Sequence, residues 1–222
     1  VALDNVKAKV YSYSYSETAD FCPANLQLQE GGYFTFNLVY PAYRTIYGKE
    51  VAAGTIEGCT VGIPGWVNVE NGIAAAAAAL IGGIEPEKVK DALAAFQGVE
   101  RRFDIHLNTP QIAYIDDYAH HPNEISSAIS SIRNIFPGRK LTAVFQPHLY
   151  TRTRDFAKEF AQSLSLVDEL VLLDIYPARE LPIEGVTSQI IFDDVTVGKK
   201  VLLKKDEALG YLEGCSIDIL AT

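Results

Sequence analysis

From about residue 110 onward, short apolar runs alternate with segments whose apolar residues recur every three to four positions. Runs of the first kind predict buried strands, and segments of the second kind predict amphipathic helices. The expected strands lie at 113–115, 141–145, 169–174, 200–204 and 218–221. The expected helices lie at 123–136, 153–166, 188–195 and 207–213. This alternation predicts an α/β fold, with a mostly parallel sheet covered by helices on both faces.

The first part of the chain has a different pattern. Polar residues alternate with apolar or aromatic ones at 6–16 and again at 33–40, which predicts strands. An alanine-rich helix is expected at about 69–81, and a second helix is expected to begin at Pro86 and to end at Gly98. We therefore expect two domains: a β-rich portion with two helices at residues 1–102, and the α/β domain at residues 103–222.

Composition and charge narrow the classes of function. The hydrophobic fraction of 48% allows a sizeable core, and the net charge of −9 argues against a nucleic-acid partner. The longest apolar run, at 73–84, is too short to cross a membrane, and no signal peptide precedes it. Three scattered cysteines fit a reducing compartment, so we expect a cytoplasmic protein without a membrane partner. The chain lacks methionine and closes on an expected strand, which indicates a piece of a longer protein.

Polar residues gather after three of the expected parallel strands, at 116–121, 146–155 and 174–180. Because the carboxyl ends of parallel strands share one edge of a sheet, we expect these loops to converge there. They contain three of the four histidines, namely His120, His121 and His148. The alternative is that three unrelated solvated loops carry them. Convergence predicts a ligand site at this edge.

Two arginines make the second of these loops a candidate anion site. Arg152 and Arg154 are expected at the amino end of the helix at 153–166, where the helix dipole disfavours cations. Such a placement suggests that they meet a carboxylate or a phosphate, bound bidentately. The alternative is solvation, or pairing with Asp155 and Glu159.

Other motifs are weak or missing. Arg101 and Arg102 lie at the predicted domain junction, where ligands often bind, although paired surface charge is the alternative. The chain has no phosphate-binding P-loop, no dinucleotide fingerprint, no nucleophile elbow and no cysteine metal set, so no metal ligands are predicted. On its residues alone, the chain is a ligand-binding α/β domain with an anion site, joined to part of another domain.

Taken together, several strings resemble the Mur ligases over almost the whole chain. The strings are Pro64-Gly65-x-x-Asn68-x-x-Asn71 and residues 98–103, 116–122, 145–155 and 174–180. Those at 116–122 and 145–155 are specific to the member that adds L-alanine. The family has a UDP-binding domain, a central ATPase domain with a P-loop, and a carboxy-terminal Rossmann-like domain. The resemblance implies that this chain is the incomplete end of the central domain followed by most of the third.

The implied activity is ATP-dependent amide formation in peptidoglycan precursor synthesis. ATP activates the carboxylate of UDP-N-acetylmuramate as an acyl phosphate, which the amine of L-alanine attacks. ATP and Mg²⁺ are expected to be bound mainly upstream of this chain, which is expected to be inactive alone. The alternatives are the related ligase that recycles murein tripeptide and a non-catalytic module that binds a nucleotide or an amino acid.

The resemblance also implies nucleotide contacts. Asn68 and Asn71 resemble the pair of residues near the adenine. Asp117, with Asp116 beside it, resembles the acceptor for the ribose hydroxyls. Arg101 or Arg102 resembles a hinge arginine near the nucleotide.

Amino-acid contacts are implied in the same way. Tyr118, His120, His148 and Arg152 resemble the wall of the amino-acid pocket, and Arg154 is a further candidate for substrate binding. Arg152 resembles the clamp for the alanine carboxylate, and proton transfer by His120 is a hypothesis. These two are the expected catalytic residues.

Two positions depart from the family pattern. Val67 stands where the family usually has histidine, and Leu149 stands where it usually has arginine. The second departure lies in the expected amino-acid pocket, so it bears on the choice of amino acid.

Overall fold

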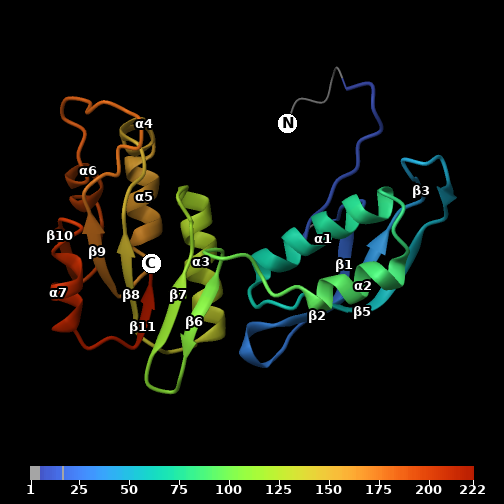
Figure 1. Ribbon diagram of the computed structural model, residues 1–222, viewed down its shortest axis with the longest axis horizontal. Coiled ribbons are helices and arrows are strands. Elements are labelled where there is room, and N and C mark those ends of the chain that lie inside the picture. The colour runs from blue at the N-terminus through green and yellow to red at the C-terminus, as the bar shows by residue number, and fades with distance from the viewer. Residues whose placement is uncertain (1–5, 17) are drawn as a thin grey trace. The chain divides into compact units, whose positions relative to one another are not determined.

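The computed structural model describes residues 6–16 and 18–222 and divides the chain into two compact units, Val1–Gln97 and Gly98–Thr222 (Figure 1). Each unit has its own hydrophobic core. The domain boundary expected after residue 102 stays a prediction. Among the residues described, no helix has the length and apolarity needed to cross a membrane.

The second unit is built on a six-stranded sheet in the order β10-β9-β8-β11-β7-β6. Its strands are β6 (Asp104–Asn108), β7 (Ala113–Asp116), β8 (Leu141–Phe145), β9 (Glu169–Leu173), β10 (Lys199–Leu203) and β11 (Ile219–Ala221). Every neighbouring pair is parallel except β6 and β7. The five predicted strands and the mostly parallel sheet are confirmed. Strand β6 was missed because it lies at the edge and is largely exposed, so it lacks an apolar run.

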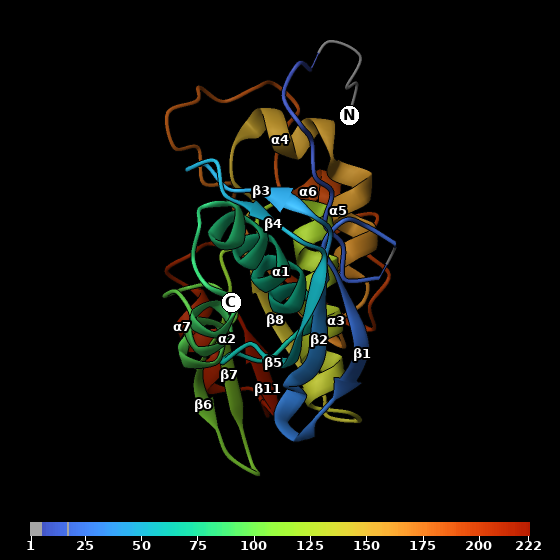
Figure 2. The same cartoon turned by 90° about the vertical axis from the view of Figure 1, so that its right-hand side faces the viewer.

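Helices cover both faces of this sheet, as predicted. The helices are α3 (Pro122–Ile135), α4 (Tyr150–Asp155), α5 (Ala157–Leu164), α6 (Gln189–Phe192) and α7 (Ala208–Glu213). Side chains of α3, α5 and α6 share one core with Leu170 and Leu172 of β9, whereas α7 packs on Val171 and Leu173. Because successive strand residues face opposite sides, β9 contributes to both cores. Figure 2 shows α7 on one side of the sheet and α3 and α5 on the other.

The prediction of one helix at 153–166 was wrong. Helix α4 begins three residues earlier, and at Phe156 the backbone leaves the helical region (φ −123°, ψ 22°) before α5 begins. The ring of Phe156 packs on that of His121 with centroids 4.9 Å apart. Arg152 and Arg154 therefore lie in the last turn of α4, where the helix dipole favours cations, and not at a helix amino end as expected.

The first unit combines small antiparallel sheets with two helices. Its strands are β1 (Cys22–Leu28), β2 (Phe34–Tyr40), β3 (Tyr43–Arg44), β4 (Glu50–Val51) and β5 (Gly54–Thr60), with a 3-10 turn η1 (Glu30–Gly32) after β1. The strands form a β1-β2-β5 sheet and a β3-β4 hairpin. Helices α1 (Trp66–Ile81) and α2 (Pro86–Ala95) confirm both predicted helices, and β2 confirms the strand expected at 33–40.

The strand predicted at 6–16 is wrong. The only ladder contact of this segment, within the described residues, is an isolated bridge between Tyr13 and Phe21. The alternation has another cause: Tyr11 and Tyr15 pack as separate aromatic side chains against Phe21 and Trp66, with centroids 5.9 and 4.6 Å apart. Aromatic packing thus imitates the period of a strand, although the segment shares only two backbone hydrogen bonds with Phe21 among those of the described residues.

Candidate functional site

The three polar loops converge at the carboxyl edge of the six-stranded sheet, as predicted. They surround a pocket of about 550 Å³. It is lined by residues 116–120, 144–146, His148, Leu173 and Tyr176, together with Arg101, Lys205 and Thr222. In Figure 1 the loops after β8 and β9 lie at the top of the sheet, beside α4. Parallel topology therefore brings residues more than 50 positions apart onto one wall.

Aromatic rings from all three loops form a chain across this pocket. The ring centroids of Tyr118 and His120 are 5.1 Å apart, those of His120 and His148 are 6.5 Å apart, and those of His148 and Tyr176 are 5.4 Å apart. Burial lowers the pKa of His148 below its ordinary value, and the charges of Arg152 and His120 lower it further. His148 is therefore neutral at pH 7 and able to accept a proton or a hydrogen bond.

The orientation of His120 follows from its neighbours. Its Nδ1 lies 2.8 Å from the carbonyl oxygen of Tyr118. Since a carbonyl only accepts, Nδ1 carries the hydrogen in the neutral ring, and Nε2 is left as an acceptor. The carboxylate of Glu124 accepts the backbone N–H groups of His120 and His121 at 3.0 and 3.2 Å, which fixes this loop at the start of α3.

The two adjacent aspartates have different surroundings. Asp117 accepts the backbone N–H groups of Phe103 and Ala119, both at 2.7 Å, and burial raises the pKa of its carboxyl. Asp116 faces Arg101 instead, with its carboxylate 3.2 Å from Nε of that arginine. The Arg101 guanidinium also lies 5.2 Å from the ring centroid of Tyr118. All three residues line the pocket, but Asp117 binds the backbone, while Asp116 and Arg101 are paired with each other.

Arg152 and Arg154 also have different surroundings. Arg152 is not among the lining residues, but its charge acts on the neighbouring His148. Its Nη1 atom is buried and has no hydrogen-bond partner among the residues that the structure describes. Arg154 is exposed and paired with Asp155 at 2.8 Å, which was one of the two alternatives for it. Arg102 is exposed and does not line the pocket either.

Asn68 and Asn71 lie in the first unit, on α1. Both line an apolar cavity of about 480 Å³ between α1 and α2, with Lys88 beside them. The Nδ2 group of Asn68 donates to the carbonyl of Pro64 at 2.7 Å, so its Oδ1 atom remains available, and Asn71 is exposed.

Lys205 is a pocket residue that the sequence reasoning missed. It lines the pocket two residues after the end of β10 and has no ion-pair partner in the described part of the chain. The rule that identified the other loops would have found it, because Lys205 is the first residue after the strand expected at 200–204.

Comparisons with known proteins agree with this fold. Residues 101–213 match the family described as Mur ligase, glutamate ligase domain. The UDP-N-acetylmuramate–L-alanine ligase of Parabacteroides distasonis is 52% identical over 212 residues, which cover 96% of this chain and 43% of that protein. The enzyme of the same name from Phocaeicola vulgatus is 46% identical, covering 96% and 44%. The chain thus spans less than half the length of these relatives.

Solved structures share the fold. The crystal structure of a UDP-N-acetylmuramate–alanine ligase from Thermotoga maritima superimposes with a TM-score of 0.67 at 24% identity, over 95% of this chain and 43% of that one. A murein peptide ligase from Psychrobacter arcticus gives a TM-score of 0.62 at 20% identity, over 94% and 42%. The family match spans residues 101–213 of the 222 in the chain, so the chain belongs to the Mur ligase family.

Proposed function

We propose that the whole protein is an ATP-dependent ligase that joins L-alanine to UDP-N-acetylmuramate in the cytoplasm, and that this chain supplies its amino-acid pocket. The relatives that carry this name, at 52% and 46% identity, support the assignment. The structural observation that supports it is a neutral His148 near Arg152, whose Nη1 has no partner among the described residues. An amino acid offers a carboxylate to the arginine and an ammonium N–H donor to the imidazole.

Residues in the pocket and Arg152 beside it fit the demands of amide formation. The carboxylate of L-alanine suits Arg152, since a charge-assisted bond would give its buried Nη1 a partner. The ammonium group has to lose a proton before its nitrogen can attack the activated carboxyl carbon. His148 is neutral, and Nε2 of His120 is free to accept, so either ring can take that proton. Tyr118 adds an aromatic wall beside His120.

Nucleotide contacts are proposed on each unit separately. Asn68 and Asn71 offer amide groups beside an apolar cavity that suits a flat base. On the second unit, Asp116 is the better acceptor for ribose hydroxyls, because its donors are the exposed side chains of Arg101 and Thr222, which a ligand can displace, whereas Asp117 accepts two backbone N–H groups. Arg101 is the better candidate for the hinge arginine, since it lines the pocket and Arg102 does not.

ATP supplies the phosphoryl group that activates the muramate carboxylate. The chain contains no P-loop for its phosphates. Over residues 6–16 and 18–222, no group of three or more His, Cys, Asp or Glu side chains is placed to hold a metal ion. We therefore assign no Mg²⁺ ligand and no metal-dependent step to this chain.

The proposal is tested by phosphate release from the whole protein with ATP, Mg²⁺, UDP-N-acetylmuramate, and L-alanine, L-serine or glycine in turn. Release that requires both the muramate nucleotide and L-alanine is the expected result. His120→Gln should lower the turnover number and change its pH dependence if the ring takes the proton; an unchanged profile would leave that task to His148. Release with a murein tripeptide in place of L-alanine would identify the recycling ligase. No release from folded protein would favour a binding module.

A further inference from the structure

The loop after β9 is bound to the loop after β8 at several points. Backbone hydrogen bonds join Leu149 to Tyr176 at 3.0 Å and Tyr176 to Pro147 at 2.8 Å. Beyond them, the carboxylate of Glu180 accepts both the backbone N–H of Thr151 at 3.0 Å and its hydroxyl at 2.5 Å. Glu180 thus reaches across 29 positions of sequence to the first turn of α4.

Helix α4 depends on such outside contacts. It has only six residues, and Leu149, which precedes it, forms no side-chain cap. So short a helix is unstable alone, and its free N–H groups need acceptors. Leu149 also has a strained backbone (φ 75°, ψ 134°), a conformation that glycine adopts far more easily than leucine. The Glu180 carboxylate provides the missing cap from another loop.

Two of the proposed substrate residues depend on where α4 lies. Arg152 is part of this helix, and His148 precedes it by two residues. Hydrogen bonds from Thr151 hold the pKa of Glu180 below its ordinary value, so the carboxylate stays ionised at neutral pH. Because the unpartnered nitrogen of Arg152 is buried, the side chain cannot change its conformation freely to compensate for a shift of α4. Its position has to be set by the backbone of α4.

We propose that Glu180 is a positioning residue for amino-acid binding: through Thr151 it fixes α4, and thereby holds Arg152 and His148 in place at the pocket. The inference rests on the proposed function. The contending account is that Glu180 is a surface contact that stabilises the fold without affecting the pocket.

Kinetics of the whole protein separate the two accounts. Glu180→Ala should raise the KM for L-alanine about tenfold, the effect of losing a helix cap of ordinary strength. It should leave the KM for ATP within about twofold, and any fall in kcat, through the displaced His148, should be smaller than the rise in the KM for L-alanine. Glu180→Gln keeps an acceptor oxygen, so its KM for L-alanine should lie between those of Glu180→Ala and the unchanged protein. Thr151→Val should give a KM similar to that of Glu180→Gln. Glu184→Gln is the matched control, because Glu184 is exposed on the same connection and should change nothing.

An unchanged KM for L-alanine in folded Glu180→Ala would overturn the inference, as would an equal loss of kcat with every substrate. A second readout does not require activity. In whole protein labelled with ¹³C-histidine, Glu180→Ala should move the His148 ring signals and weaken its cross-peaks to Tyr176, whereas Glu184→Ala should not. Unchanged His148 signals would reject the inference, while displaced signals in a protein without amino-acid-dependent phosphate release would reject the proposed function alone.

Discussion

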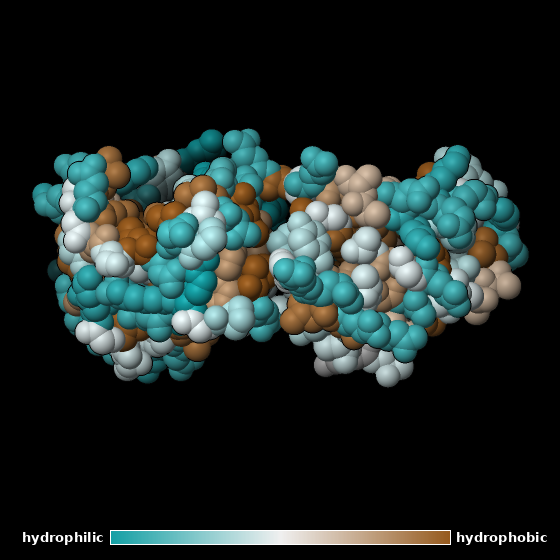
Figure 3. Space-filling model, turned by 90° about the horizontal axis from the view of Figure 1, so that it is seen from below, coloured by the Kyte–Doolittle hydropathy of each residue, from teal (hydrophilic) through white to brown (hydrophobic). Residues whose placement is uncertain are grey.

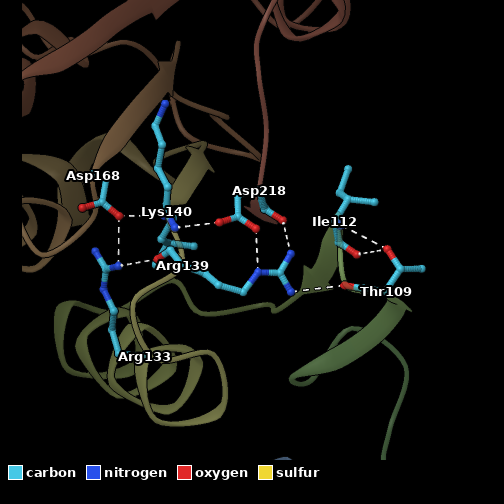
Figure 4. A network of polar contacts seen from close by, with 8 residues as sticks. Thr109, Ile112, Arg133, Arg139, Lys140, Asp168 and Asp218 are labelled. Carbon is cyan, nitrogen blue, oxygen red and sulfur yellow. Dashed lines mark hydrogen bonds and ion pairs between the residues drawn. The ribbon is translucent and has the colours of Figure 1, made fainter.

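The two edges of the six-stranded sheet differ in how completely their cations are paired. At the amino edge, where the parallel strands begin, the cations are paired (Figure 4). The pairs are Arg133–Asp168 at 2.9 Å, Arg139–Asp218 at 2.5 Å, and Lys140 and Lys199 with Glu169 at 2.7 and 3.2 Å. At the carboxyl edge, Lys205 has no ion-pair partner and Arg152 keeps an unpartnered nitrogen, within the described residues.

The paired residues of the amino edge stabilise the fold, whereas the unpaired groups of the carboxyl edge are available to a ligand. The amino-edge acids also bind backbone: Asp168 accepts the N–H of Leu141 at 2.7 Å, and Asp218 accepts that of Lys140 at 3.0 Å. These bonds fix the start of β8 to its neighbours. Figure 3, which views the molecule from below Figure 1, shows hydrophilic residues mixed with hydrophobic patches on this side. At the carboxyl edge, Arg101 and Arg154 are paired with Asp116 and Asp155, but within the described residues Lys205 and Nη1 of Arg152 have no partner, so a bound anion gains most at these two.

The largest effect should come from Arg152→Met, which tests whether the carboxyl edge serves binding. We expect the KM of the whole protein for L-alanine to rise about 10- to 100-fold, or roughly 1.5–3 kcal/mol for one charge-assisted contact. The free energy of unfolding should stay level or rise, because a buried unsatisfied nitrogen is removed. Arg179→Met, on an exposed loop residue, is the control. An unchanged KM would remove Arg152 from the clamp.

Glu169→Ala tests the opposite edge. The side chain is only 10% exposed and joins two lysines and Thr142, so we expect urea unfolding to show a loss of about 1–2 kcal/mol. The expected loss of stability is no larger because both lysines are about half exposed and can be solvated without Glu169. The KM for L-alanine should not change. If it rises as much as in Arg152→Met, the division between the edges fails.

Leu149 tests whether the carboxyl edge stores strain. Leu149→Gly should be more stable than Leu149→Ala by about 1 kcal/mol, since relief of a positive φ outweighs the greater chain entropy of glycine. Arg154, inside α4, is the control position, and there the alanine variant should be the more stable of the two. The same order at both positions would mean that Leu149 is unstrained. Thermal unfolding of the four variants decides this.

The smallest effect is the pH dependence of stability. Burial opposes ionisation of Asp168 and Glu169, but Arg133 and the lysines hold both pKa values below the ordinary 3.8 and 4.5. Their contribution is complete above those values and is lost as the pH falls through the lowered pKa. Burial raises the pKa of Asp117 above 3.8, so its contribution has the opposite sign and acidification favours folding.

The pH dependence can therefore be divided between the edges. The free energy of unfolding should fall less steeply below about pH 5 in Asp168→Asn and more steeply in Asp117→Asn, each compared with the unchanged chain. Urea unfolding at a series of pH values measures both slopes. Equal slopes in the two variants would contradict the assigned shifts.

Much of the α/β architecture could be predicted, because buried parallel strands are apolar runs and their helices repeat every three to four residues. The convergence of the polar loops followed from the direction of the strands. The break at Phe156 was missed because the apolar period continues through it. Neither the bond from the Phe103 N–H to Asp117 nor the cap from Glu180 could be foreseen, since these contacts span 14 and 29 positions of sequence.

Strand β11 has a consequence for the order of assembly during synthesis. It pairs with β7 on one side and β8 on the other, although it is made more than 70 residues after both (Figure 1). Until the ribosome has released residues 219–221, β7 and β8 have no shared neighbour in the sheet, and each leaves a row of backbone groups open. The loops that carry His120 and His148 therefore come together late. The pocket is therefore complete only after residues 219–221 have left the ribosome and paired with both strands.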